Sequence, residues 1–259
     1  MKQSALAAEQ FGATAQAYLT SAVHAQGADL QRLGQLVASL VSGRASPVDA
    51  LDLGCGAGHA AFHMAEAGAR VTACDLSTRM LEVVGAEASR RGLATLQTRQ
   101  SPAERLPFDD RAFDLVATRF SAHHWSDVPA AMRETRRVLK PGGILVVIDV
   151  IAPQQPLFDT LIQTVEILRD ASHVRDYRVS EWASMLHDAG FEAPSSDTWK
   201  LRMEFATWVA RMRTPPLRVD AIRDVLAGAA QEARQHFDVA DDGSFDLDVA
   251  WLQTTTSAR

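Results

Sequence analysis

The stretch that decides the fold is Val48-Asp49-Ala50-Leu51-Asp52-Leu53-Gly54-Cys55-Gly56-Ala57-Gly58-His59. It reads as a short apolar strand that runs into a loop with glycine at every second position, and a helix-prone apolar run follows over 60–67. Glycines allow a tight turn and a close approach to a ligand, because no Cβ stands in the way. Asp75 ends a second strand-like run about twenty residues past the first glycine. An acidic residue there accepts hydrogen bonds from both hydroxyls of a ribose, so we expect a nucleoside-containing cofactor at the carboxyl edge of a parallel sheet.

Strand-like and helix-like segments alternate through the first part of the chain. Ser77 is placed to cap one helix, and Gly92 is placed to end it. Asp127 is placed to cap a further helix, which Pro141-Gly142-Gly143 stops. The last strand-like run is almost continuously apolar, as is typical of a central strand buried on both faces. This alternation predicts an α/β fold with a parallel, doubly wound sheet. Strands are expected at 48–53, 70–74, 93–99, 113–119 and 144–151.

The segments outside this core read as mainly helical. Residues 1–42 have apolar side chains at helical spacing, and a second helical stripe covers 157–168. Ser180 is placed to cap a helix that Gly190 closes. Further segments are expected as strand-like at 191–205, mostly helical at 206–237 and a last strand at 245–254. With no clear linker, one domain is expected over 1–259, made of a helical cap (1–45), a cofactor-binding core (46–151) and a C-terminal part with a substrate-side helical insertion (152–259).

The composition is that of an ordinary globular protein. Of its residues 47% are hydrophobic and 22% are charged, and the net charge of −6 provides no basic field for nucleic acid. No apolar run approaches the ~20 residues that span a bilayer, and no secretory signal is visible. The two cysteines, Cys55 and Cys74, give neither a disulfide framework nor a Cys-x-x-Cys zinc site. We therefore expect a cytoplasmic protein, monomeric or homodimeric, with a small-molecule substrate, no nucleic-acid partner, no membrane span and no metal.

The glycines are spaced G-x-G-x-G after an acidic residue, Asp52, and not in the dinucleotide pattern G-x-G-x-x-G. Together with two later blocks, this resembles the class I S-adenosylmethionine-dependent methyltransferases, and among them the ubiquinone and menaquinone biosynthesis methyltransferases. The blocks are Ser101 to Val116, which looks like the family's adenine-contacting turn and fourth strand, and Arg137 to Val147, which looks like its turn into the fifth strand. The resemblance implies a Rossmann-like, mostly parallel seven-stranded sheet with an antiparallel last strand and extra helices. It also implies S-adenosyl-L-methionine as cofactor and S-adenosyl-L-homocysteine as product.

The resemblance assigns expected roles to individual cofactor residues. Asp75 binds the ribose hydroxyls, Ala103 and Glu104 form the adenine turn, and Arg119 lines the aminopropyl end. Tyr18 lies in an N-terminal segment where many members fold an aromatic residue over the cofactor. The alternatives are a helix cap for Asp75, ordinary packing for Tyr18 and a surface turn for the adenine segment. The full expected set is Tyr18, Asp52, Gly54, Cys55, Gly56, Gly58, Asp75, Leu76, Met80, Ala103, Glu104 and Arg119.

Two adjacent histidines, His123 and His124, follow the fourth strand, where the resemblance places the transferred methyl group. Each is a candidate general base near neutral pH, and the resemblance favours His124; the alternative is a structural or surface histidine. His173 and Arg175, in the C-terminal part, are candidate substrate-binding residues, and Arg211 lies in a second arginine-containing stretch there. Such arginines either bind an acidic substrate group or form a solvated, salt-bridging face.

The expected function is transfer of a methyl group from S-adenosylmethionine to a carbon or oxygen of a small organic molecule, by in-line displacement. Two alternatives stay open: a cofactor-binding protein of the same fold without methyl transfer, and a nicotinamide-dependent oxidoreductase. The oxidoreductase pattern requires glycine or alanine at the position of His59. The quinone enzymes carry a Phe-Gly-Leu-Arg-Asn-type segment where this chain has Phe120-Ser121-Ala122-His123-His124, so the substrate stays open.

Overall fold

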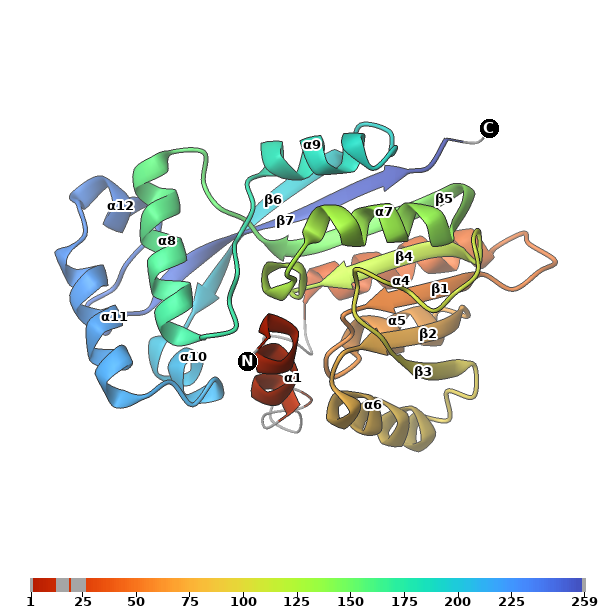
Figure 1. Ribbon diagram of the computed structural model, residues 1–259, viewed down its shortest axis with the longest axis horizontal. Coiled ribbons are helices and arrows are strands. Elements are labelled where there is room, and N and C mark those ends of the chain that lie inside the picture. Colours follow the sequence, from red (N-terminus) through yellow and green to blue (C-terminus); the bar gives the residue numbers. More distant parts are fainter. Residues whose placement is uncertain (1, 13–18, 20–26, 258–259) are drawn as a thin grey trace.

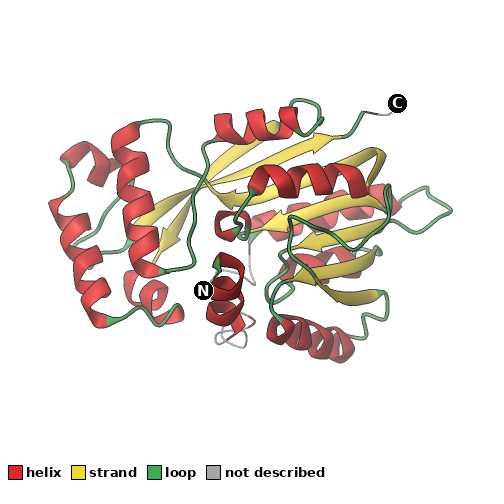
Figure 2. Ribbon diagram, viewed as in Figure 1, coloured by secondary structure: helices red, strands yellow, loops and turns green. Residues whose placement is uncertain are grey.

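A seven-stranded sheet forms the centre of the molecule, with helices on both of its faces (Figure 1) (Figure 2). This computed structural model describes residues 2–12, 19 and 27–257. The strand order is β3-β2-β1-β4-β5-β7-β6. The pairings from β3 to β5 are parallel, whereas β7 runs antiparallel to both of its neighbours. The strands are β1 (Asp49–Leu53), β2 (Arg70–Asp75), β3 (Leu96–Gln100), β4 (Phe113–Arg119), β5 (Leu139–Val150), β6 (Ser195–Met203) and β7 (Phe245–Thr255).

The strand order places the ligand site before any side chain is considered. The chain leaves β1 on one side toward β2 and returns on the other side to β4, so the order reverses between β1 and β4. In open α/β sheets, ligands bind in the crevice outside the carboxyl ends of the strands at such a reversal. The glycine loop after β1, Asp75 at the end of β2 and Arg119 at the end of β4 all reach this edge.

Helices cover the two faces of the sheet with separate apolar clusters. α4, α5 and α6 pack on one face, and α7 and α9 pack on the other. In β5, Val146 and Ile148 point to the first cluster while Leu145 and Val147 point to the second, which confirms a central strand buried on both sides. The helices are α1 (Gln3–Gly12), α4 (Ala28–Val41), α5 (His59–Glu66), α6 (Thr78–Arg91), the short 3-10 helix η1 (Ala122–His124), α7 (Val128–Val138), α8 (Pro156–Arg169), α9 (Val179–Asp188), α10 (Phe205–Arg211), α11 (Pro216–Gly228) and α12 (Gln231–His236).

Two of the expected helix caps are confirmed by hydrogen bonds. The Ser77 hydroxyl accepts from the Met80 N–H at 3.3 Å, and the Asp127 carboxylate accepts from the Ala130 N–H at 2.8 Å. Each bond satisfies an N–H of the first helical turn that has no partner within the helix. Gly92 ends α6 in the left-handed conformation, with φ of 72°.

Two other expected boundaries are wrong. α9 begins one residue before Ser180, because the Glu181 carboxylate accepts from the Arg178 N–H at 2.8 Å, so that Arg178 is the N-cap. Ser180 instead contacts Gln154 with its hydroxyl. Pro141-Gly142-Gly143 does not stop α7, because the helix already ends at Val138 and these residues lie within β5.

The C-terminal elements form a third apolar cluster beyond the edge of the cofactor core. α8, α10, α11 and α12 gather around the ends of β6 and β7, at the left of Figure 1. Trp208 and Phe245 lie at the centre of this cluster, with their ring centroids 5.0 Å apart. This cluster lies beside the carboxyl edge of the sheet. Several of its residues line one side of the site described below.

The first glycine of the loop after β1 has no room for a side chain. Gly54 has φ of 70°, and a Cβ there would lie 2.0 Å from the Oγ of Ser121. We expect Gly54→Ala to destabilise the fold by about 1–3 kcal/mol, since it adds both left-handed strain and a steric clash. Gly85, inside α6, is the matched control, because a Cβ there meets nothing within 4 Å. Gly85→Ala should stabilise by about 0.5–1 kcal/mol, and chemical denaturation of both variants measures the difference. Equal stability of the two variants would contradict this account of Gly54.

Candidate active site

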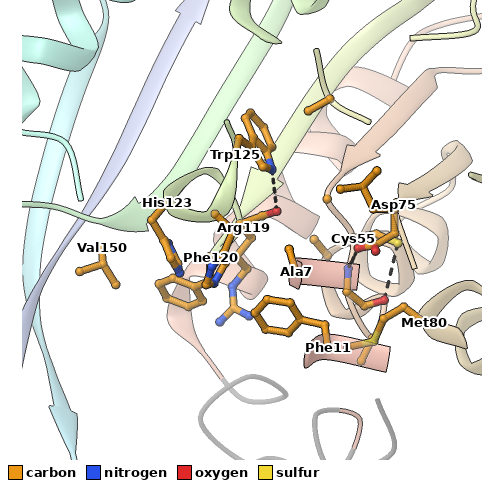
Figure 3. Close-up of a pocket in the computed structure, with 18 of the residues that line it drawn as sticks. Ala7, Phe11, Cys55, Asp75, Met80, Arg119, Phe120, His123, Trp125 and Val150 are labelled. Atoms are coloured by element: carbon orange, nitrogen blue, oxygen red, sulfur yellow. Dashed lines mark hydrogen bonds between the residues drawn. The ribbon is translucent and has the colours of Figure 1, made fainter. Parts of the chain in front are cut away.

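A cavity opens at the carboxyl edge of the sheet and continues toward the C-terminal cluster. Its volume is about 1460 Å³, including space open to solvent. Figure 3 shows Asp75, Cys55 and Met80 at one end and His123, Phe120 and Val150 at the other, with Phe11 and Arg119 between them. The lining residues therefore fall at two ends of one cavity. Of the expected cofactor residues, its lining includes Asp52, Gly54, Cys55, Gly56, Asp75, Leu76, Met80, Ala103, Glu104 and Arg119.

Asp75 joins the two loops that follow β1 and β2. Its Oδ2 accepts from the Gly56 N–H at 2.9 Å, and its Oδ1 accepts from the Ser77 N–H at 2.8 Å. Burial raises the pKa of the carboxyl, while these backbone donors oppose the rise. Asp75 therefore lines the cavity with a carboxyl group whose orientation is fixed by backbone N–H groups.

Asp52, at the other side of the glycine loop, is almost completely buried. Its Oδ2 accepts from the Ala61 N–H in the first turn of α5 at 2.8 Å, which links β1 to that helix. Burial, together with the charge of Asp75, raises the pKa of Asp52 to about 7. A cationic ligand group at this end of the cavity would stabilise the charged form of both carboxylates.

Two other expected cofactor residues have local structural roles. Gly58 does not line the cavity; its backbone has φ of 87°, and a Cβ there would lie 2.9 Å from both Phe62 and Val84, so it allows α5 and α6 to pack closely. Glu104 lines the cavity, but its Oε1 accepts from the Ser126 N–H at 3.0 Å. Glu104 thereby ties the expected adenine turn to the segment after β4.

The middle of the cavity is covered by α1 and by a buried ion pair. Phe11 of α1 contacts the ring of His124 edge-on, with centroids 4.7 Å apart. Arg119, at the end of β4, pairs through Nε with the carboxylate of Asp29 at the start of α4, and both side chains are 7% exposed. Tyr18, the aromatic residue expected over the cofactor, lies outside the described residues, and Phe11 is the described aromatic residue from this part of the chain that lines the cavity.

The two adjacent histidines have different hydrogen-bond partners. The Nδ1 of His123 lies 2.6 Å from the Oδ1 of Asp149, at the end of β5. The Nδ1 of His124 lies 3.1 Å from the carbonyl oxygen of Ser172. A carbonyl can only accept, so Nδ1 of His124 carries the proton and Nε2 keeps its lone pair. Both histidines line the cavity.

These surroundings shift the pKa values of the two rings in opposite directions. Burial lowers the pKa of His123, but the charge and hydrogen bond of Asp149, followed by the charges of Asp176 and Glu166, outweigh it and raise the pKa to about 9. Burial lowers the pKa of His124, and the positive charge of His123 lowers it further. At neutral pH His123 is therefore an imidazolium and His124 a neutral imidazole.

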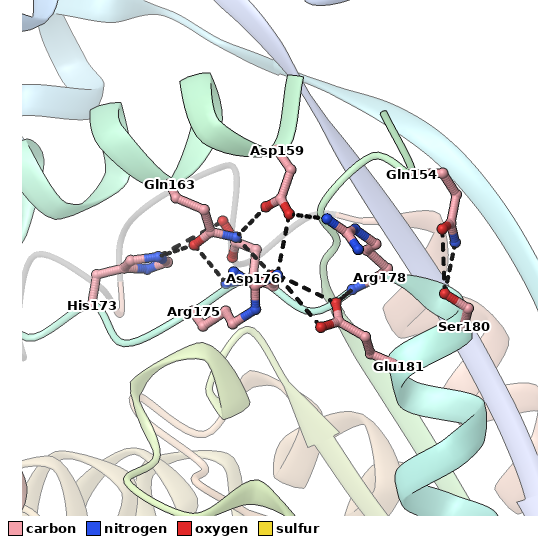
Figure 4. A network of polar contacts seen from close by, with 9 residues as sticks. All are labelled: Gln154, Asp159, Gln163, His173, Arg175, Asp176, Arg178, Ser180 and Glu181. Carbon is pink, nitrogen blue, oxygen red and sulfur yellow. Dashed lines mark hydrogen bonds and ion pairs between the residues drawn. The ribbon is translucent and has the colours of Figure 1, made fainter. Parts of the chain in front are cut away.

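The structure does not bring His173 and Arg175 to this cavity. Figure 4 shows both in a polar network, and neither is among the residues that line the cavity. His173 donates through Nε2 to the Oε1 of Gln163 at 3.0 Å, and Arg175 donates through Nη2 to the Oδ2 of Asp159 at 3.1 Å. Their geometry fits a role in holding the segment before α9 against α8, and it provides no contact to a substrate in the cavity.

The far end of the cavity is built by residues that the sequence analysis did not single out. Glu166 and Arg169 come from one face of α8, and Arg211, which was considered, comes from α10. Arg169 donates through Nε to the carbonyl oxygen of Trp208 at 3.2 Å and lies over the indole ring. Glu166 and Arg169 are three positions apart in the chain, as in an ion pair on one face of a helix. This spacing is the signal by which the sequence could have pointed to them. The other residues of this end are Phe120, Val150, Leu201, Met203, Trp208 and Leu247.

The strand order, the glycine loop and the acidic residue after β2 define the class I methyltransferase fold. A family model described as a methyltransferase domain matches residues 51–147. YafE of Escherichia coli (strain K12), an uncharacterised protein, is 47% identical over 201 residues, which are 78% of this chain and 97% of YafE. The chain belongs to this methyltransferase family.

Two further proteins support the same family. YcgJ of Bacillus subtilis (strain 168), an uncharacterised methyltransferase, is 34% identical over 227 residues, 88% of each chain. The crystal structure of YcgJ superposes with a TM-score of 0.81 at 33% identity and covers 88% of this chain and 99% of that one. The demethylmenaquinone methyltransferase of Chlorobaculum tepidum is 36% identical over 112 residues, which are 43% of this chain and 44% of that enzyme.

Among the described residues, none of the helices combines the length and apolarity needed to cross a membrane.

Proposed function

We propose that this chain is an S-adenosylmethionine-dependent methyltransferase that acts on a carbon or oxygen of a small organic molecule. The observation that carries the proposal is one continuous cavity with a fixed carboxylate, Asp75, at one end and an imidazole with a free lone pair, His124, at the other. Both ends belong to the same sheet edge, so a bound cofactor and a second molecule would meet there. The cofactor product would be S-adenosylhomocysteine.

The residues at the first end fit the proposed cofactor in charge and in hydrogen bonding. Asp75 would accept from the ribose hydroxyls, and Leu76 and Met80 would contact the adenine. Burial raises the pKa of Asp52 and Asp75, and the positive sulfonium of a ligand that has no phosphate would favour the charged forms of both carboxyl groups. When bound, S-adenosylmethionine supplies a methyl carbon on a positively charged sulfur, which is open to in-line attack.

The chain's own contribution at the second end is alignment and proton removal. Phe120 and Trp208 line this end and Phe11 covers the middle of the cavity, so apolar side chains would help to shield the reacting groups from water. His124 would accept the proton of the nucleophile at Nε2, because its Nδ1 is committed to Ser172. His123 is charged and hydrogen-bonded at neutral pH, so we assign the general base to His124 and not to His123.

Calorimetric titration of the protein with S-adenosylmethionine, S-adenosylhomocysteine and NADH tests the proposal first. We expect micromolar binding of the first two and no binding of NADH. Methyl-labelled S-adenosylmethionine with a panel of phenols, enols, thiols and amines then tests transfer. Binding of NADH alone would support an oxidoreductase, whereas cofactor binding without transfer to any acceptor would support a binding protein of the same fold. A folded sample that binds neither S-adenosyl compound would contradict the proposal.

A further inference from the structure

The geometry around His123 points to a class of substrate, and this inference rests on the proposed function. We propose that His123, held by Asp149, acts as a fixed imidazolium that stabilises an oxygen anion on the substrate, and that the substrate is a mostly apolar molecule with an acidic hydroxyl, a phenol or an enol. Asp149 is then a positioning residue. The proposal adds a role for two residues beyond the general base, His124.

The Asp149 carboxylate fixes both the ring of His123 and the backbone that carries it. Its Oδ1 accepts from the Nδ1 of His123 at 2.6 Å, and its Oδ2 accepts from the Ala122 N–H at 2.9 Å. Asp149 is 2% exposed, so these hydrogen bonds are shielded from water. With Nδ1 committed, Nε2 is the ring nitrogen left to donate, and within the described chain it has no hydrogen-bond partner while the residue lines the cavity.

Carboxyl groups surround His123 from several elements, and burial raises the pKa of two of them, Glu166 and Asp176. Asp149 comes from β5, Glu166 from α8, and Asp176 from the segment before α9. Two neutral rings complete the surroundings: His124 on η1, with centroids 4.2 Å apart, and His173, with centroids 5.8 Å apart. Burial and the charge of His123 lower the pKa of both. The positive charge of this histidine cluster therefore resides on His123.

This charge decides which acceptor the site can activate. His124 is a weak base, because its pKa is lowered, so it takes a proton efficiently only from an acidic group. The imidazolium beside it makes a hydroxyl more acidic by stabilising the anion that ionisation leaves. A phenol or enol ionises far more readily than an aliphatic alcohol, so a site that stabilises an oxygen anion favours a phenol or enol as acceptor.

The proposed step conserves atoms and charge. The substrate O–H bond breaks, its proton passes to Nε2 of His124, and the electron pair stays on oxygen beside Nε2–H of His123. The electron pair on oxygen, or on a carbon conjugated with it, then forms the new bond to the methyl carbon. At the same time the carbon–sulfur bond of the methyl donor breaks. When carbon is methylated, its own proton leaves to solvent to restore conjugation. The apolar wall of Val150, Met203 and Leu247 faces the substrate body.

Nitrogen NMR of ¹⁵N-histidine-labelled protein tests the charge directly, without cofactor or substrate. At pH 7.5 we expect both nitrogens of His123 to be protonated, with titration near pH 9, and His124 to be the neutral Nδ1–H tautomer. His123→Gln assigns the signals. Asp149→Asn should lower the titration midpoint of His123 by about one to three pH units. A neutral His123 at pH 7.5, or an unchanged midpoint in Asp149→Asn, would overturn the proposal.

A chromogenic phenol, 4-nitrophenol, tests the oxygen anion. With S-adenosylhomocysteine present, the ionisation midpoint of the bound phenol should fall by about one to three pH units relative to water. This lowering of the ionisation midpoint should disappear in His123→Gln and persist in His124→Gln. The equilibrium ionisation of the phenol depends on the positive charge of His123 and not on proton removal by His124. A bound phenol that ionises as it does in water, or a protein that binds S-adenosylhomocysteine but no phenol of a substituted series, would overturn the proposed substrate class. Neither result would affect the cofactor assignment, which fails only if the S-adenosyl compounds do not bind.

Discussion

His124→Gln is expected to reduce kcat by about 10²–10⁴-fold on any acceptor that the labelling screen identifies, with no change in the affinity for S-adenosylmethionine. Glutamine keeps a donor near the Ser172 carbonyl but has no basic nitrogen to take the proton. His124 would act in the reaction step and not in cofactor binding. The variant should therefore lower kcat and leave the cofactor affinity unchanged. Steady-state kinetics with labelled S-adenosylmethionine measure it.

His187→Gln is the matched control for this variant, because His187 lies exposed near the end of α9. It should retain the parent kcat. If His124→Gln also retains it, proton removal by His124 is ruled out and the nucleophile must arrive already ionised. The pH profile adds a second check on the parent protein. Activity should fall as pH rises through about 9, because His123 loses its proton there.

Asp75→Ala is expected to weaken S-adenosylmethionine binding by about 10²-fold. A hydrogen bond to a charged group contributes about 1.5–3 kcal/mol, and each 1.4 kcal/mol is a factor of about 10 in affinity. The variant also frees the N–H groups of Gly56 and Ser77, so part of the loss would come from the loop. Calorimetry with S-adenosylmethionine and S-adenosylhomocysteine measures both affinities.

Asp75→Asn separates the two contributions, because it keeps one acceptor oxygen for the backbone but removes the charge. We expect its affinity to lie between those of the parent and of Asp75→Ala. Thermal unfolding of both variants checks that the fold is retained. Parent-like affinity in both would remove Asp75 from the ribose role and leave it as a link between the loops after β1 and β2.

The part of the fold from β1 to β5 could be predicted from the sequence, because the patterns that indicate its strands and helices are local. An apolar run, a left-handed turn and a capping side chain such as Asp127 depend on residues a few positions apart. The Ser180 cap was predicted by the same logic and is wrong, because Glu181 reaches back to the Arg178 N–H one step earlier. A local rule names the candidates, and competition between neighbours decides which of them caps the helix.

The second half of the site could not be predicted in this way because its contacts are distant in the chain. His123 meets Asp149 only because β4 and β5 are adjacent in the sheet. His124 meets Ser172 across an even longer separation. The sequence predicted both histidines as candidate bases, and both line the cavity, but their tautomers and charges come from these partners. Trp208 joins the cavity only because α10 folds against the start of β7.

The place of β7 between β5 and β6 has a consequence for the order of assembly during synthesis. Strands β1 to β5 pair with one another from one contiguous stretch of chain. β6, in contrast, has no neighbour in the sheet until β7, the last strand to be synthesised, inserts beside it. The pairing of β1 to β5 can therefore begin during synthesis, while the end of the cavity that Leu247 of β7 lines is completed only after the final strand has left the ribosome. A growing chain would therefore form the proposed cofactor end of the cavity before the proposed substrate end.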